Sequence, residues 1–121
     1  MTITLDTGLW VEAGPLDRVQ PERGAAVLLP DGRQVAVFRT YDGQVYAVGN
    51  VDPRCGAAVL SRGIVGDRRG EPTVASPMYK EVYSLRTGRC LDDPSLTVPV
   101  YPARVRAGTI EIDPQPGPEI T

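Results

Sequence analysis

The hydrophobic and polar positions between residues 25 and 48 follow the pattern of a β-meander. An apolar run, Ala25–Leu29, ends at Asp31-Gly32, and a β-branched and apolar run, Gln34–Arg39, follows it. Asp42-Gly43 then precedes a third, alternating run, Gln44–Val48. Asp-Gly pairs are typical of tight hairpin turns, because both residues tolerate a positive φ. The pattern therefore predicts three antiparallel strands joined by two turns.

A second hairpin is predicted near the end of the chain. The stretch "YPARVRAGTIEID", residues 101–113, reads as a strand, a turn at Ala107-Gly108 and a second strand. Alternation in that last strand places Ile110 and Ile112 on one face of a sheet. The chain also has 13 Gly and 12 Pro, many for its length, which favours turns and short strands over long helices.

The remaining segments are short. The stretches "TVAS" (residues 73–76) and "KEVYSLRTG" (80–88) predict two brief strands with a turn at Thr87-Gly88, and "GDRRGEP" (66–72) predicts a loop. The stretch "LDRVQ" (16–20) predicts one helical turn, and no segment sustains a helical period. We therefore predict an all-β fold, a small β-sandwich or partly open barrel of short antiparallel strands.

Length and composition indicate one globular domain, residues 1–113, followed by a proline-rich flexible tail, "PQPGPEIT", residues 114–121. Hydrophobic residues make up 41% and charged residues 23% of the chain, and the net charge is −2. This charge gives no basic field to attract nucleic acid or an acidic membrane. No run is long enough to span a membrane, and the N-terminus lacks the features of a secretory signal, so we expect a cytoplasmic protein.

The absence of histidine limits the chemistry of this sequence. With no histidine, the sequence cannot supply a Ser-His-Asp or Cys-His catalytic set, nor an imidazole ligand for a metal. No carboxylate pair, phosphate-binding loop or nucleophile–base pair stands out, so no catalytic residue is predicted. Two cysteines, Cys55 and Cys90, are too few for a disulfide framework. They are expected to be small buried hydrophobic residues, with a redox switch as the alternative.

Two stretches have the layout of an iron–sulfur motif. A Rieske [2Fe–2S] site takes one Cys and one His from each of two loops, as Cys-x-His and Cys-x-x-His. The stretches "AVGNVDPRCGAAVLSRG" (residues 47–63) and "VASPMYKEVYSLRTGRC" (74–90) resemble these two loops. The four ligand positions are then occupied by a set with no cysteine or histidine: Asp52, Arg54, Ser76 and Tyr79. The resemblance therefore implies a Rieske-like fold without a cluster and predicts no metal site.

The resemblance is more specific than the general fold. The pattern "N-x-D-P…VLSRG…ASP…Y-x-L-x-x-G-x-C", within a likeness running from about Trp10 to Ile112, is similar to the small subunits of assimilatory NAD(P)H-dependent nitrite reductases. The resemblance implies a non-catalytic subunit of an enzyme that converts nitrite to ammonium in nitrate assimilation. The large subunit would be its partner and would carry FAD, siroheme and a [4Fe–4S] cluster. The alternative is a cluster-free Rieske-like scaffold or regulatory domain of another oxidoreductase.

The resemblance also suggests roles for individual residues. Asp52 either starts a turn with Pro53, which we favour, or forms a salt bridge with Arg54 in place of the cluster. Arg54 could equally donate hydrogen bonds to carbonyl groups across the gap between the loops. Ser76 would end a strand, and Tyr79 would either fill the former cluster cavity or contact a partner.

If the fold is kept, residues 50–63 and 75–81 meet at one tip. We expect this tip to contact the large subunit, with Arg54 and Tyr79 near its centre. The predicted partner-binding residues are Arg54, Tyr79 and Lys80.

Overall fold

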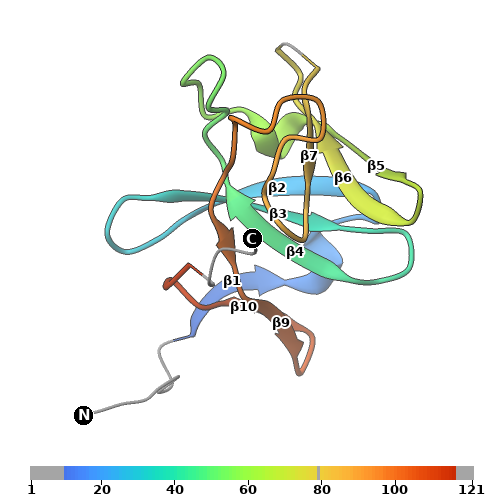
Figure 1. The fold of residues 1–121 in the computed structure, drawn as a ribbon. Helices are drawn as coiled ribbons and strands as arrows, with labels where there is room; N and C mark the ends of the chain where they lie inside the picture. The colour runs from blue at the N-terminus through green and yellow to red at the C-terminus, as the bar shows by residue number, and fades with distance from the viewer. Residues whose placement is uncertain (1–9, 79, 117–121) are drawn as a thin grey trace.

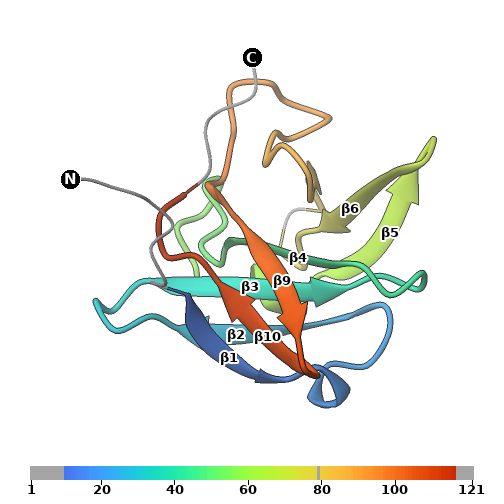
Figure 2. The same cartoon turned by 90° about the horizontal axis from the view of Figure 1, so that it is seen from below.

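The structure is a computed structural model that describes residues 10–78 and 80–116. Within these residues, three antiparallel sheets contain ten strands, and two short 3-10 turns lie between strands. Figures 1 and 2 show a larger sheet between two smaller ones. The predicted all-β fold is therefore confirmed, and helical structure in the described part is limited to the two short 3-10 turns. The strands do not close into a single barrel, because they divide into three separate sheets.

The central sheet contains the predicted meander. Its strands are β2 (Arg23–Leu28), β3 (Gln34–Arg39), β4 (Val45–Gly49) and the short β8 (Val100–Tyr101), in the order β2-β3-β4-β8. Both predicted Asp-Gly turns are present, but only the glycines adopt a positive φ, 95° at Gly32 and 88° at Gly43. The aspartates act through their side chains instead, because each Oδ1 atom accepts a backbone amide two residues further along.

The predicted C-terminal hairpin forms the second sheet. Strand β9 (Ala103–Arg106) pairs with β10 (Thr109–Ile112), and β1 (Val11–Pro15) covers the other edge of β10. The turn is where the sequence places it, with positive φ at both Ala107 and Gly108. The predicted helical turn after β1 is the 3-10 turn η1 (Leu16–Arg18).

The third sheet corrects one sequence expectation. Strands β5 (Ile64–Arg68), β6 (Glu71–Ala75) and β7 (Val82–Ser84) pair in that order. The stretch at 66–72 was expected to be a loop, but only Arg69 and Gly70 form the turn, with φ of 55° and 87°. The rest of that stretch is strand, because its residues pair across a β5–β6 hairpin. The 3-10 turn η2 (Leu60–Arg62) precedes this sheet.

Strand β3 is buried on both faces, and this explains the three-layer arrangement. Ala36 and Phe38 belong to a core cluster shared with the β5–β7 sheet, whereas Val35 and Val37 belong to a second cluster shared with the β1-β10-β9 sheet. Because successive side chains of a strand point to opposite faces, one strand can supply both cores. The β5–β7 sheet therefore packs on one face of β3, and the β1-β10-β9 sheet packs on the other face.

The limits of the predicted domain, 1–113, and tail, 114–121, remain predictions. Residues 114–116 are described, and Arg33 Nη2 donates a 2.9 Å hydrogen bond to the Pro114 carbonyl. Residues 117–121 lie outside the described part. Among the helices of the part that is described, none is long and apolar enough to serve as a membrane span.

Candidate functional site

Two loops meet where the sequence places the ligand positions. Loop one (residues 50–63) follows β4, and loop two (residues 75–81) connects β6 to β7; both rise on the same side in Figure 1. The loops are in direct contact, because Ser76 Oγ of loop two donates a hydrogen bond to Asp52 Oδ2 of loop one. Two of the four ligand positions are therefore bonded directly to each other.

The carboxylate of Asp52 is the centre of this contact. Tyr83 Oη donates a 3.0 Å hydrogen bond to Asp52 Oδ1, and the backbone amide of Arg54 donates to the same oxygen at 2.9 Å. The side chains of Asp52 and Tyr83 are 0% exposed, and Ser76 is 1% exposed. A buried carboxylate is stable when hydrogen bonds replace its lost water, and this one has three donors. We call Asp52, Ser76 and Tyr83 the Asp52 network.

The electrostatics of the network favour an ionised carboxylate. Burial by itself would raise the pKa of Asp52, but the hydrogen bonds from Ser76, the Arg54 amide and Tyr83 outweigh it and lower the pKa below its ordinary value. Burial and the adjacent Asp52 carboxylate raise the pKa of Tyr83 well above its ordinary value. Asp52 is therefore a charged acceptor and Tyr83 a neutral donor at physiological pH.

The backbone of each loop also forms a tight turn. The Asp52 carbonyl accepts from the amides of Cys55 at 3.2 Å and Gly56 at 2.7 Å, which confirms the interpretation of Asp52-Pro53 as the start of a turn. That interpretation was incomplete, because the Asp52 side chain also joins the two loops. In loop two, the Lys80 amide donates to the Ser76 carbonyl at 3.0 Å, and Lys80 has a φ of 64°.

Arg54 connects three segments, in a manner that the sequence did not reveal. Its Nη2 atom lies 3.1 Å from Glu81 Oε2 in loop two and 3.3 Å from Asp93 Oδ2 in the segment after β7. The hypothesis of a salt bridge between the Asp52 and Arg54 side chains was wrong, since the Asp52 carboxylate accepts from the Arg54 backbone amide and the guanidinium pairs with other carboxylates. Among the described residues, the partners of the Arg54 side chain are carboxylates rather than the expected carbonyl groups.

The base of the two loops is fixed by close packing. Asn50, the first residue of loop one, is 1% exposed. Its side chain accepts from the amide of Ser61, near the end of the loop, at 2.7 Å and donates to Oε1 of Gln34, the first residue of β3, at 3.0 Å. Asn50 therefore fixes both ends of loop one to strand β3. A Cβ at Gly63 would lie 2.4 Å from the Ala75 carbonyl oxygen. Glycine at this position lets loop one approach the backbone of loop two.

The other predicted site residues are placed as follows. Lys80 is exposed, whereas Tyr79 lies outside the described residues. Cys90 is buried in the first core cluster, as expected, but the expectation for Cys55 was wrong, because Cys55 is exposed in the loop-one turn. Both thiols are free. Sequence reasoning missed Glu81, Asp93 and Tyr83 as partners of the loops, although Tyr83 is the tyrosine of the "Y-x-L-x-x-G-x-C" part of the pattern.

The donor atoms at the described ligand positions do not fit a Rieske [2Fe–2S] cluster. Such a cluster needs thiolates on one iron and imidazoles on the other. Here the Asp52 carboxylate is occupied by three hydrogen-bond donors, and the Arg54 guanidinium would place a fixed cation beside the irons. No group of three or more His, Cys, Asp or Glu side chains suitable for a metal occurs among residues 10–78 and 80–116.

Comparisons with known proteins agree with this geometry. A family model described as "Rieske-like [2Fe-2S] domain" matches residues 9–113. The chain is 40% identical over 104 residues to the nitrite reductase (NADH) small subunit of Escherichia coli K12, a match that covers 85% of this chain and 95% of that protein. It is 41% identical over 106 residues to part of the nitrite reductase [NAD(P)H] large subunit of Klebsiella oxytoca, covering 88% of this chain and 11% of that protein.

A solved structure extends the likeness to three dimensions. A crystal structure described as an NADH-dependent nitrite reductase small subunit from Mycobacterium tuberculosis matches with a TM-score of 0.82 and 58% sequence identity. The match covers 85% of this chain and 92% of that one. The family identified by the motif is therefore supported by sequence and by structure.

Proposed function

Because the chain belongs to the Rieske-like [2Fe–2S] domain family, we propose that it is the non-catalytic small subunit of an NAD(P)H-dependent nitrite reductase. It is homologous to nitrite reductase small subunits along most of its length. In this proposal it binds the large subunit of the enzyme in the cytoplasm. The reduction of nitrite to ammonium, with the FAD, siroheme and [4Fe–4S] cluster that it needs, takes place in that partner.

The Asp52 network is the observation that carries the non-catalytic part of the proposal. Two of its members, Asp52 and Ser76, stand at positions from which a cluster would be held, and they join the two loops by a hydrogen bond instead of metal coordination. A domain that keeps this tip without the cysteine and histidine ligands of a cluster would act by presenting a surface for binding, and not by transferring electrons. The large-subunit chain of Klebsiella oxytoca, which contains a segment 41% identical to this chain, supports a place for such a domain beside the catalytic parts.

We propose further that the tip is the docking surface. Arg54, Tyr79 and Lys80 remain the predicted partner-binding residues. Two apolar side chains strengthen the case, because Val51 in loop one is 48% exposed and Met78 in loop two is 54% exposed. Loops already held in one conformation lose less entropy when they bind, so the network would favour association.

Co-purification with the large subunit tests the function. The two chains should form a stable complex when they are expressed together, and reduced nicotinamide should be oxidised in the presence of nitrite. The small subunit purified alone should contain no stoichiometric iron after incubation with iron and sulfide. If no complex forms, the alternative of a scaffold for another oxidoreductase is favoured; if a Rieske-type spectrum appears, the non-catalytic role is wrong.

Single substitutions test the docking surface. Tyr79→Ala and Met78→Ala should each weaken binding to the large subunit by about 1–3 kcal/mol if they are anchors, with the thermal midpoint unchanged. Val105→Ala is the matched control, because Val105 is 41% exposed on strand β9, in the sheet that does not contain the loops. Equal affinity in all three variants would place the interface elsewhere on the domain.

A further inference from the structure

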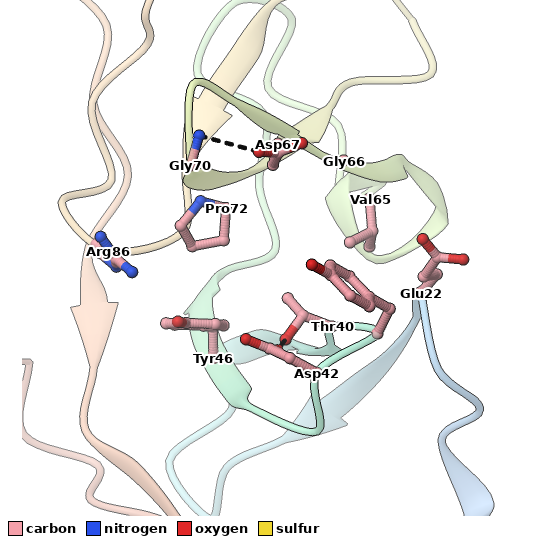
Figure 3. Close-up of a pocket in the computed structure, with 11 residues that line it drawn as sticks. Glu22, Thr40, Asp42, Tyr46, Val65, Gly66, Asp67, Gly70, Pro72 and Arg86 are labelled. Atoms are coloured by element: carbon pink, nitrogen blue, oxygen red, sulfur yellow. Dashed lines mark hydrogen bonds between the residues drawn. The ribbon is translucent and has the colours of Figure 1, made fainter.

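A cleft lies away from the tip, between two turns. The β3–β4 turn and the β5–β6 turn extend to the same side of the molecule in Figures 1 and 2, whereas both loops of the tip rise on another side in Figure 1. The cleft between the turns has a volume of about 210 Å³. Figure 3 shows its lining, which comes from four separate parts of the chain. The Asp52 network does not contribute to it.

Negative charge dominates the cleft. Its lining includes three carboxylates, Glu22, Asp42 and Asp67, and one basic side chain, Arg86. In Figure 3 the carboxylates stand on different sides of the cleft. The Thr40 hydroxyl, followed by the Gln44 amide, lowers the pKa of Asp42, so this carboxylate is ionised at neutral pH. The cleft therefore offers several acceptors that converge on one space.

Each carboxylate keeps an oxygen that can accept from a ligand. Only Oδ1 of Asp42 and only Oδ2 of Asp67 accept hydrogen bonds within the described part of the chain. The Glu22 side chain makes no hydrogen bond or ion pair there, and its backbone has a φ of 66°. This φ belongs to the turn that precedes β2, in which the Arg23 amide donates to the Gln20 carbonyl.

Aromatic rings complete the lining. Tyr41 is 79% exposed at the β3–β4 turn, and the partly buried Tyr46 lies on strand β4. A planar cation stacks on a tyrosine ring while its N–H groups bond nearby carboxylates, and arginine is the side chain that combines both properties. A lysine ammonium lacks the flat face that stacking requires.

We propose that this cleft receives an arginine side chain of the large subunit, as a second contact beside the tip. This inference rests on the proposed function. A partner protein is favoured over a free small molecule because Glu22, Tyr41, Asp42 and Asp67 are all exposed, so the cleft is open. Sites for free ligands usually enclose most of the ligand surface, whereas an open cleft suits a side chain presented by a larger surface.

Variants of the cleft, tested on the full chain with the large subunit, examine this contact. Tyr41→Ala should weaken binding roughly two- to thirtyfold, the range expected for loss of a cation–π contact. Glu22→Gln should weaken it about two- to fivefold and reduce its salt dependence, and Glu22→Lys should weaken it at least about tenfold by charge repulsion. Glu12→Gln is the control, because it removes an exposed carboxylate from strand β1. None of these changes removes a described contact of the core.

A small probe tests the cleft without the large subunit. N-acetyl-L-arginine methylamide, titrated into the isolated chain, should shift the NMR signals of the amides of residues 22, 41 and 67. The corresponding citrulline compound, which has a similar shape and no charge, should shift them far less. Saturable shifts with both compounds, or with neither, would overturn the assignment to a guanidinium.

The outcomes separate this inference from the proposed function. If the wild-type chain binds the large subunit and the cleft variants bind equally well, the cleft is not a contact and the proposed function stands. If the wild-type chain does not bind, the proposed function fails and the partner assignment fails with it, while the probe still decides the guanidinium preference. If sedimentation shows a dimer of this chain that Glu22→Gln weakens, the occupant is a second copy and the partner assignment is wrong.

Discussion

Replacing Tyr83 with Phe isolates one hydrogen bond of the Asp52 network. The ring of Tyr83 stays in the core, and only the hydroxyl that donates to Asp52 Oδ1 at 3.0 Å is lost. A hydrogen bond to a charged group contributes about 1.5–3 kcal/mol, so we expect the free energy of unfolding to fall by about 2 kcal/mol. Asp52→Ala should cost more, about 3–5 kcal/mol, because it leaves the Ser76 and Tyr83 hydroxyls buried without an acceptor and also removes the partner of the Arg54 amide.

A double-mutant cycle measures the contact directly. Tyr83→Phe, Asp52→Ala and the double variant should show a coupling energy of about 1–2 kcal/mol, since the two side chains touch. The free energies come from urea unfolding followed by circular dichroism. Hydrogen exchange supplies a local measure, because the amides of Arg54 and Met78, which donate to Asp52 and Ser76, should exchange faster in each variant.

Tyr46→Phe is the matched control, because the Tyr46 hydroxyl has no hydrogen-bond partner among the described residues. This variant should stay within about 0.5 kcal/mol of the wild type. The reasoning is refuted if Tyr83→Phe is equally silent, or if the cycle is additive. Faster exchange throughout the core, without a larger effect at the loops, would show that Tyr83 supports the core alone and does not hold the tip.

Three further results are expected. Because the pKa of Asp52 lies below its ordinary value of 3.8, the folded state binds fewer protons than the unfolded state in acid. The free energy of unfolding should therefore be constant near neutral pH and fall as the pH drops through the lowered pKa. Urea titrations at several pH values should show a smaller fall for Asp52→Asn. Gly63→Ala should lower the free energy of unfolding by about 1–3 kcal/mol, because its Cβ would lie 2.4 Å from the Ala75 carbonyl oxygen; an unchanged free energy would mean that the loops move apart freely. Arg54→Met should cost less than about 1 kcal/mol in the same assay, since its ion pairs are partly exposed, while amide exchange in loop two becomes faster.

The parts of the fold that the sequence predicts are those set by neighbouring residues. The meander and the C-terminal hairpin follow from Asp-Gly and Ala-Gly turns between alternating runs, and both signals are local. Strand β5 is different, because most of its residues are exposed and its pattern is polar. It is a strand because it pairs with β6 along its whole length, with Asp67 opposite Pro72. Strand β6 is held in turn on its other side, where the Pro72 carbonyl accepts from the Leu85 amide. That pairing is a tertiary effect, so local propensity misses it.

The candidate site divides in the same way. The turn at Asp52 could be predicted from Asp-Pro, because it depends on adjacent residues. The hydrogen bonds of its carboxylate join residues 24 and 31 positions away, and the ion pairs of Arg54 join residues 27 and 39 positions away. The motif placed the ligand positions but did not reveal what the new side chains contact. One signal could have suggested the Asp52–Ser76 bond. Asp52, a hydrogen-bond acceptor, stands at the cysteine position of loop one, and Ser76, a hydroxyl donor, stands at that of loop two.

Residues of the tip can act on binding in two ways, and the structure separates them. Asp52, Ser76 and Tyr83 are buried and cannot touch a partner, so any effect they have on affinity must come through the conformation of the loops. The side chains of Val51 and Met78 are exposed, and Met78 bonds Ser76 only through its backbone amide, so the effect of replacing either side chain should come from contact. A change in the network should therefore lower stability and affinity together, whereas a change in the exposed pair should lower affinity alone. The network can be compared with a cluster as the support of the tip by measuring a series of Asp52, Ser76 and Tyr83 variants. If the network is that support, the variants whose loop amides exchange hydrogen fastest should also bind the large subunit most weakly.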